Sequence, residues 1–317
     1  MELYTPDHVP GPFGMNNTGA ICYFNSLLQA LLSCPALTIA VYERSQDESS
    51  PSETTKEYFE YASKANLAKA EPFGNLRVLS ALLADLDRLG KRRRFGAGQE
   101  CASEAFIYML ECMSAPTDLF DDLFMHAFVG TVYCPNCREV VSTSRDRVAQ
   151  MDMYFMNDLP DVSTPHAFAR GLVSHSQPLD DYVCDRCRQK IATRRQYKMV
   201  LCPEIVVCLF DIYGFYHPRP TVPHYFPPEF QLQAKRAGPN DPDSNEEQVL
   251  EYRAVAQIEH FGSMGGGHYV ARGLRNDGKV YVFNDSSVPA VSAIQPTPNT
   301  YLVFYHVTDA PKRFLKR

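Results

Sequence analysis

The pattern of apolar positions predicts an amphipathic helix near the start of the chain. After the polar stretch GMNNTGAI, apolar side chains recur at helical spacing: Phe24, Leu27, Leu28, Leu31 and Leu32. Pro35 ends this pattern. Cys22 therefore lies at or just before a helix N-terminus, where free N–H groups and the helix dipole lower the pKa of a thiol. This position favours a reactive thiolate, and a small buried cysteine is the alternative.

The same analysis predicts further helices, strands and loops along the chain. Helical spacing marks residues 75–88 and 98–110, and strand-like segments cover residues 139–144, 200–210, 252–259 and 300–306. Polar segments at residues 45–55 and 221–248 predict surface loops, the second with a hairpin. Helices followed by strands indicate an α+β fold with a mainly antiparallel sheet.

A glycine-rich segment near the other end of the chain presents a histidine. His268 follows three glycines, and the strand-like segment after it leads to Asn284 and Asp285. A thiol nucleophile needs a base, and the base needs a third group that holds its tautomer. Cys22, His268 and Asn284 supply these roles in chain order. Asp285 is also eligible for the third role, since neighbours in a strand point to opposite faces, and a structural histidine is the alternative for His268.

Two CxxC pairs stand between strand-like segments and predict a metal site. They are Cys134 with Cys137 and Cys184 with Cys187, separated by the 46 residues from 138 to 183. Four thiolates suit tetrahedral Zn²⁺ and leave no open position, so we expect a structural metal at the tips of two hairpins. Unmetallated thiols and a redox motif are the alternatives. The other six cysteines show no disulfide spacing, which favours a reducing compartment.

Composition narrows the class of protein further. The chain has 317 residues, 45% hydrophobic residues and a net charge of −6, which suits one large or two smaller globular domains. The acidic balance argues against nucleic-acid binding, including a zinc-ribbon nucleic-acid binder. Residues 1–13 lack the apolar run of a signal peptide, and the most apolar window, 199–210, is too short to span a bilayer. We expect a monomeric intracellular protein, in the cytoplasm or nucleus, without a membrane.

Three segments in this order resemble the catalytic domain of ubiquitin-specific proteases. GMNNTGAICYFNSLLQ is similar to the family's Cys box, and HFGSMGGGHYV and VYVFND are similar to its His box. Ile21 and Val280 depart from it, where the family prefers Thr and Trp. The resemblance implies one papain-like catalytic domain over residues 12–308, with tails at 1–11 and 309–317. It divides the domain into a helical thumb (about 12–115), antiparallel fingers that hold the zinc (about 116–205) and a palm with the His box (about 206–308).

The resemblance also implies the reaction. A member of this family hydrolyses peptide and isopeptide bonds at the C-terminal glycine of ubiquitin, so Cys22 would be the nucleophile, His268 the base and Asn284 the group that orients His268. Asn17, five residues before Cys22, matches the family's oxyanion asparagine. Asn16 is also chemically eligible, and asparagine is common in turns.

Partner contacts are carried over from the family in the same way. The 98–110 helix resembles the family helix whose acidic side chains hold the arginines of the ubiquitin tail. The implied ubiquitin-binding residues are Gln99, Glu104, His260 and Tyr269. Cys101 takes the place of one acidic residue of the family, which predicts a weaker affinity for ubiquitin or a preference for a different C-terminal tail. Residues 262–267 are placed like a flexible loop beside the active site. An inactive ubiquitin-binding relative and a protease for a ubiquitin-like modifier remain the alternatives.

Overall fold

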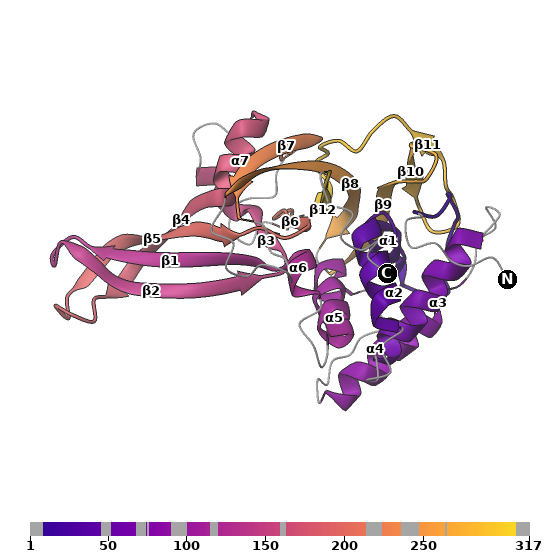
Figure 1. Cartoon of the computed structure of the whole chain (residues 1–317), viewed down its shortest axis with the longest axis horizontal. Helices are drawn as coiled ribbons and strands as arrows, with labels where there is room; N and C mark the ends of the chain where they lie inside the picture. The colour runs from indigo at the N-terminus through magenta and orange to yellow at the C-terminus, as the bar shows by residue number, and fades with distance from the viewer. Residues whose placement is uncertain are drawn as a thin grey trace.

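The computed structural model describes residues 9–45, 52–67, 74, 76–89, 100–114, 120–158, 163–213, 224–235, 247–263 and 265–308. The helices and much of a curved sheet share one end of the long axis, and a β-stranded arm projects from the other end (Figure 1). The chain builds most of the helices first, then the arm, then most of the sheet. This order is the one that the sequence predicts for an α+β fold.

The helical part comprises α1 (Cys22–Leu31), α2 (Pro35–Ser45), α3 (Glu53–Leu67), α4 (Leu76–Arg88), α5 (Ala102–Ser114) and the short α6 (Asp121–Phe124). The apolar patterns predicted α1 and α4 correctly. The helix expected at 98–110 begins later, because the carbonyl of Cys101 accepts the first helical hydrogen bond, from the N–H of Ala105 at 3.0 Å. The predicted loop at 45–55 is shorter than expected, because α3 already begins at Glu53; residues 46–51 lie outside the described part.

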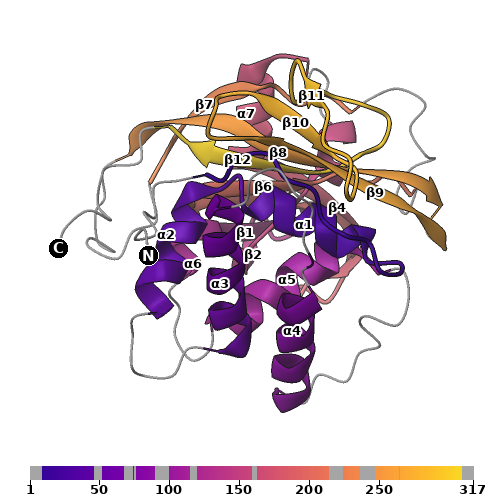
Figure 2. The same cartoon turned by 90° about the vertical axis from the view of Figure 1, so that its right-hand side faces the viewer.

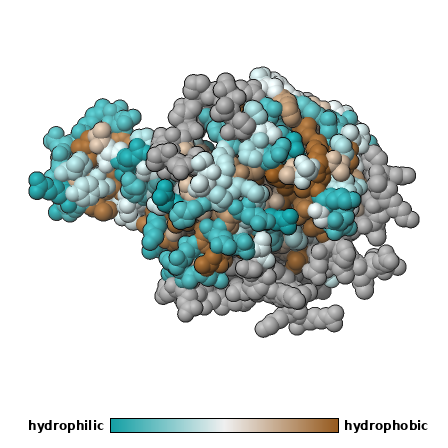
Figure 3. All heavy atoms as spheres, turned by 90° about the horizontal axis from the view of Figure 1, so that it is seen from above, coloured by the Kyte–Doolittle hydropathy of each residue, from teal (hydrophilic) through white to brown (hydrophobic). Residues whose placement is uncertain are grey.

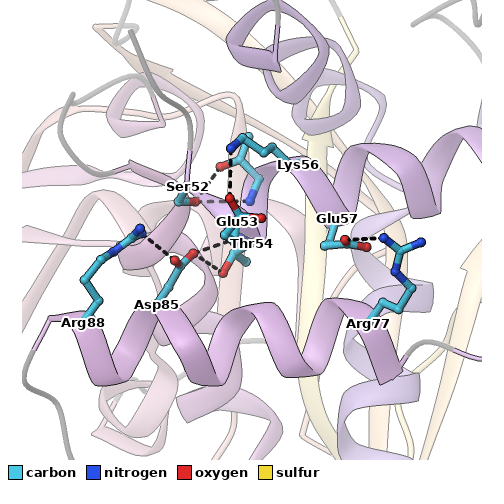
Figure 4. Close-up of polar contacts among 9 residues, drawn as sticks. Ser52, Glu53, Thr54, Lys56, Glu57, Arg77, Asp85 and Arg88 are labelled. Atoms are coloured by element: carbon cyan, nitrogen blue, oxygen red, sulfur yellow. Dashed lines mark hydrogen bonds and ion pairs between the residues drawn. The ribbon is translucent and has the colours of Figure 1, made fainter. Parts of the chain in front are cut away.

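A buried carboxylate joins α3 to α4 (Figure 4). Asp85 of α4 accepts hydrogen bonds from the backbone N–H and the hydroxyl of Thr54, at 2.8 and 2.7 Å. Ser52 accepts the N–H of Thr55 at 3.2 Å, which is a side-chain cap of the first turn of α3. The free N–H groups at the start of α3 are thus bonded partly by its own cap and partly by the neighbouring helix.

The arm is an antiparallel sheet with the strand order β2-β1-β5-β4. Its strands are β1 (His126–Cys134), β2 (Glu139–Val148), β4 (Ser174–Val183) and β5 (Lys190–Leu201). Burial alternates along β1, so that one face of the strand is covered and the other is partly exposed. Figure 3 shows the arm extending beyond the body, with a mostly hydrophilic surface.

The central sheet has the strand order β11-β10-β9-β8-β12-β6-β3, and β7 pairs with β8. Its strands are β3 (Met151–Asp152), β6 (Ile205–Leu209), β7 (Glu229–Ala234), β8 (Gln248–Ser263), β9 (Gly266–Leu274), β10 (Val280–Phe283), β11 (Ala290–Val291) and β12 (Thr300–Val307). Only the pair of β3 with β6 is parallel among the described strands. The 3₁₀ helix Met153–Asp158 and α7 (Pro165–Val173) precede β4, and α7 packs on β7.

Two sequence predictions for this sheet were wrong in detail. The strand expected at 200–210 is divided between β5 and β6, and Pro203, which has no N–H to donate, lies in the break. The loop expected at 262–267 is instead the end of the β8–β9 hairpin, where Gly262 pairs with Gly267 and Ser263 with Gly266. The strands expected at 252–259 and 300–306 are confirmed within β8 and β12, and β7 with β8 forms the expected hairpin.

Helix α1 lies between the other helices and the central sheet (Figure 2). All of its residues are buried, and it packs against β9, β8 and α5. This arrangement brings the first residue of α1, Cys22, against the strand that carries His268. Among the described helices, none alone is long and apolar enough to cross a membrane; α1 and α2 meet those criteria only as a pair bent by 87°.

Candidate active site and metal centre

Cys22 is the first residue of α1 and is only 4% exposed. The backbone N–H groups of Tyr269 in β9, Tyr23 and Cys22 itself lie near the thiol and act to lower its pKa. Burial nevertheless raises the pKa of the Cys22 thiol, and the negative charge of Asp285 raises it further. The sequence predicted a lowered pKa. That prediction was wrong because desolvation of the thiolate outweighs the N–H donors at the helix start.

His268 and Asn284 form a hydrogen-bonded pair beside this thiol. His268 lies in β9, directly before Tyr269, and its Nε2 is 2.7 Å from Oδ1 of Asn284. Asn284 follows the last residue of β10, which pairs with β9. The structure therefore pairs two of the three residues that the sequence selected, the base and its orienting group, and it packs the strand of His268 against the helix of Cys22. In the sequence, 245 residues lie between Cys22 and His268.

Glycine is required just before the histidine. A Cβ atom on Gly267 would lie 2.2 Å from the carbonyl oxygen of Phe261 and 2.5 Å from Nε2 of His260. These distances are too short for any side chain. The glycine at 267 therefore lets β9 approach β8 and the His260 ring closely, and this approach sets the position of His268.

Asp285 lies in a turn rather than a strand, and its hydrogen bonds hold the segment around Cys22. It lies in a turn with φ of +51°, so the expectation that Asn284 and Asp285 occupy one strand was wrong. Oδ1 of Asp285 accepts from Nδ2 of Asn25 at 2.6 Å, and Oδ2 accepts from Nδ2 of Asn17 at 2.9 Å. Its carbonyl accepts the N–H of Met15 at 2.9 Å. Asp285 thus connects the loop before Cys22, and α1 itself, to the turn after Asn284.

Asn17 organises the loop that leads into α1. Its Oδ1 accepts the N–H groups of Gly19, at 3.2 Å, and Ile21, at 3.4 Å. One of its two amide N–H bonds is directed to Asp285, which leaves the other for a further acceptor. Asn16, the neighbouring candidate, makes no side-chain hydrogen bond within the described residues.

Asn25 is a residue of this site that the sequence analysis missed. It is buried on α1 one turn after Cys22, yet it carries a polar amide. Gln29 repeats this one turn later, and its Nε2 donates to the carbonyl of Phe13 at 2.9 Å. Polar residues at i and i+4 on a helix that is otherwise apolar were the signal that could have identified both as bonded interior groups.

A cluster of aromatic side chains packs around Tyr269, the residue after His268. The rings of His260 and Tyr269 are 4.4 Å apart, and the hydroxyls of Tyr269 and Tyr213 are 3.1 Å apart. Tyr301 OH lies 2.9 Å from Sγ of Cys101. Burial raises the pKa of Tyr269 and of Tyr301, so both hydroxyls stay protonated. His260 and Tyr269 are only 2% and 3% exposed, so their expected contact with ubiquitin stays a prediction.

The other expected ubiquitin-binding residues lie at the start of α5. Glu104 is exposed in the first turn, and Gln99 lies outside the described residues. Burial raises the pKa of the Glu100 carboxyl, and the nearby charge of Glu104 raises it further. Cys101, between them in sequence, turns inward to Tyr301. The carboxylates available here therefore come from Glu100 and Glu104.

The four CxxC cysteines gather at the tip of the arm. The sulfur atoms of Cys134, Cys137, Cys184 and Cys187 all lie within 4.8 Å of one another. Sγ of Cys134 is 3.9 Å from that of Cys187, and Sγ of Cys137 is 3.9 Å from that of Cys184. Tetrahedral thiolates at ~2.3 Å from a metal would be about 3.8 Å apart. The donor set therefore fits one tetrahedral ion, as the sequence predicted.

The two turns that supply these sulfur atoms have the same geometry. The residues after the second cysteine of each pair, Arg138 and Arg188, have φ of +60° and +57°. Their N–H groups donate to the carbonyls of Cys134 and Cys184, at 2.8 and 2.9 Å. The N–H of Cys187 donates to the Cys184 thiol and is the main cause that lowers its pKa to about 7. All ten cysteines of the chain are free of disulfides.

Comparison with known proteins agrees with this arrangement. The family model described as "Ubiquitin carboxyl-terminal hydrolase" matches residues 13–305. The chain belongs to the ubiquitin carboxyl-terminal hydrolase family. Members of this family named ubiquitin carboxyl-terminal hydrolase 36 are 26% identical to the chain in Drosophila ananassae and 25% identical in Drosophila melanogaster. Each alignment covers 93% of this chain but only 28% or 30% of the relative, so the chain spans about three tenths of these proteins.

Solved structures of this hydrolase family show the same fold. The SAGA deubiquitinating module Ubp8/Sgf11/Sus1/Sgf73 bound to monoubiquitin contains a chain that matches with a TM-score of 0.67 and 17% identity. The match covers 98% of this chain and 72% of that chain. The same module bound to ubiquitin aldehyde gives a TM-score of 0.66, with 96% and 71% covered. The helical part, arm and central sheet are therefore the architecture of this family.

Proposed function

We propose that this chain is a deubiquitinase that hydrolyses bonds at the C-terminal glycine of ubiquitin, with Cys22 as nucleophile. The observation that supports this most strongly is the 2.7 Å hydrogen bond between His268 and Asn284, since His268 directly precedes Tyr269, whose backbone N–H acts to lower the pKa of Cys22. Family membership supports the reaction class. Related chains in solved structures are bound to ubiquitin, which supports the choice of partner.

The pairing with Asn284 fixes which nitrogen of His268 acts as the base. Oδ1 of Asn284 accepts the Nε2–H, so Nδ1 keeps the lone pair and can take the thiol proton of Cys22. Sγ then attacks the carbonyl carbon, and the C–N bond breaks as Nδ1 returns the proton to the leaving amine. Water then attacks the thioester carbon and gives a proton to Nδ1. The C–S bond breaks, Nδ1 returns this proton to Sγ, and the carboxylate of ubiquitin is released.

The negative oxygen of each tetrahedral intermediate needs donors that are already in place. We assign this role to the second amide N–H of Asn17, together with a backbone N–H at the start of α1. Asp285 supports the assignment, because its carboxylate holds the Asn17 amide at 2.9 Å and α1 through Asn25 at 2.6 Å. The hydrogen bonds of Asp285 make it a positioning residue rather than the third member of the triad.

We further propose that the four-cysteine cluster binds a structural Zn²⁺. Cys134, Cys137, Cys184 and Cys187 would be its ligands, and a closed set of four thiolates leaves no position for substrate. Few apolar side chains surround the cluster: Ile191 is its buried neighbour, with Val141 and Tyr182 partly buried. The ion would therefore supply much of the stability of the arm tip.

Hydrolysis of ubiquitin with a fluorogenic amide at its C-terminus tests this function. The protein should release the fluorophore, and Cys22→Ala should reduce the rate to the uncatalysed level while keeping the circular dichroism of the parent protein. Ubiquitin-like modifiers with the same fluorophore serve as competing substrates. Turnover of one of these but not of ubiquitin would reassign the substrate, and turnover of none would support a ubiquitin-binding module.

A further inference from the structure

A cavity of about 660 Å³ lies away from the candidate active site. Residues from α1–α2, β8, β9 and β12 line it, including Ser33, Arg253, Leu274, Arg275 and His306. His268 is near the beginning of β9, whereas Leu274 is its last residue, so the cavity lies at the other end of that strand. Figure 2 shows this separation, with α2 and the end of β12 on one side and the β8–β9 hairpin on the other.

Arg275 is a buried cation in the wall of this cavity. It is 2% exposed, and its Nη atoms donate to Ser33 Oγ at 2.5 Å, to the carbonyls of Leu274 and Gln29 at 3.2 Å each, and to the side-chain oxygen of Gln29. Its guanidinium lies 4.1 Å from the centre of the Phe283 ring. All these partners are neutral. Within the described part of the chain, Arg275 has no carboxylate partner, and its buried Nε has no hydrogen-bond acceptor.

The charge of Arg275 is therefore held by neutral acceptors and an aromatic ring, without a carboxylate among the described residues. Burial lowers its pKa to about 9, which still leaves the guanidinium protonated at neutral pH. A buried cation without a counter-ion is costly, because its hydration is lost and nothing of opposite charge replaces it. A negative group in the adjoining cavity would supply both the missing charge and an acceptor.

A second arginine, Arg253, also lines the cavity. Arg253 of β8 is 52% exposed, and a carboxylate oxygen of Glu229 lies 3.5 Å from its Nε. The N-terminus of α2, at Pro35, adds the positive end of a helix dipole, and His306 adds an imidazole. None of the residues that line the cavity is acidic. Its apolar wall consists of Val9, Val255, Leu274 and Val307.

We propose that this cavity binds a small organic anion, with a phosphate or carboxylate group toward Arg253 and Arg275 and an apolar portion against Val255 and Leu274. The volume is in the usual range of small-molecule sites, ~300–1,000 Å³. Guanidinium groups bind both kinds of anion through charge-assisted hydrogen bonds. The apolar wall favours a ligand with a hydrocarbon body over a bare inorganic ion.

Calorimetric titration and thermal unfolding with matched probes test the proposal. Phenyl phosphate and phenylacetate carry the two head groups, inorganic phosphate lacks the apolar body, and benzyl alcohol lacks the charge. One of the aromatic anions should raise Tm by about 3 °C at ten times its Kd. Inorganic phosphate should bind more weakly, and benzyl alcohol should leave Tm unchanged. The better aromatic anion identifies the head group.

Variants then locate the binding. Arg253→Gln should weaken binding of the better anion at least tenfold, since a charge-assisted hydrogen bond is lost. Its side chain is half exposed, so the variant alone should melt like the parent. Arg145→Gln, an exposed arginine of the arm, should bind the anion normally. Equal affinity in Arg253→Gln and the parent, or no anion binding up to about 10 mM, would overturn the proposal.

Discussion

The thiol of Cys22 illustrates two opposing effects at one residue. Its position at the start of α1 supplies N–H donors that favour thiolate, but its 4% exposure removes the water that would solvate the charge. Burial is the larger effect, and Asp285 adds to it. The free protein should therefore hold Cys22 mainly as a thiol at neutral pH. This is the situation in which a general base such as His268 is required.

The charge of Asp285 can be tested through the pH dependence of Cys22. Asp285→Asn removes a negative charge that raises the pKa of Cys22, so the pKa of this thiol should fall. The measurement is the rate of iodoacetamide alkylation of the Cys22 peptide against pH, read by mass spectrometry. The midpoint of the parent curve should lie above the ~8.5 that is typical of a free cysteine, and the midpoint of the variant curve should lie at lower pH than that of the parent.

The control for this experiment is Glu104→Gln, which removes an exposed carboxylate of α5 that does not affect the Cys22 pKa. Its alkylation curve should coincide with that of the parent. A parent curve with its midpoint below the ~8.5 of a free cysteine, or no difference between parent and Asp285→Asn, would contradict the described environment of Cys22.

Asn284 should act only through His268. Asn284→Ala removes the acceptor of the Nε2–H bond, and kcat/KM for ubiquitin substrates should fall by about 10² or more. Asn284→Asp keeps an oxygen at the same place and should recover most of the loss. Steady-state kinetics against pH measure both variants. If Asn284→Ala and the parent have the same kcat, His268 does not depend on this hydrogen bond.

The junction of α3 and α4 shows how packing in the helical part depends on one buried carboxylate, that of Asp85. Asp85→Ala would leave the N–H and the hydroxyl of Thr54 without their acceptor inside the core. The free energy of unfolding should decrease by about 2–3 kcal/mol. Arg88→Ala is the matched control, because Arg88 contacts the same carboxylate from a side chain that is 62% exposed.

Thermal and urea unfolding measure both variants. Arg88→Ala should cost less than about 1 kcal/mol, as exposed ion pairs do. Similar losses for the two variants would mean that the surface ion pair, rather than the hydrogen bonds between Asp85 and Thr54, holds these helices together.

The proposed Zn²⁺ site lies at the tip of the arm. The purified protein should contain one Zn²⁺ per chain by elemental analysis, and Cys184→Ser should contain none. Hydrogen exchange at the ends of β1–β2 and β4–β5 should then become faster, because little apolar contact remains there. Cys101→Ser, outside the cluster, should keep its zinc. Full zinc occupancy in Cys184→Ser would contradict the assigned ligand set.

At the scale of the whole molecule, the sequence predicted the features that depend on local residue patterns. Apolar spacing located α1 and α4, and CxxC spacing located the cluster that the arm assembles. It failed where distant segments decide the outcome. Asn17 and Asp285 are 268 residues apart, and nothing in the local sequence of either predicts their hydrogen bond. The burial of Arg275 and of the Cys22 thiol likewise follows only from the packing of α1 on the sheet.

The central claim is that Cys22 of α1 and His268 of β9 react together, as the packing of α1 on β9 suggests. Intact-mass measurement after mixing the protein with ubiquitin that carries a thiol-reactive group at its C-terminus tests this most directly. The account predicts a gain of one ubiquitin, with the modified peptide containing Cys22 and no gain in Cys22→Ala. No adduct from folded, zinc-loaded protein, or an adduct that persists in Cys22→Ala, would contradict it.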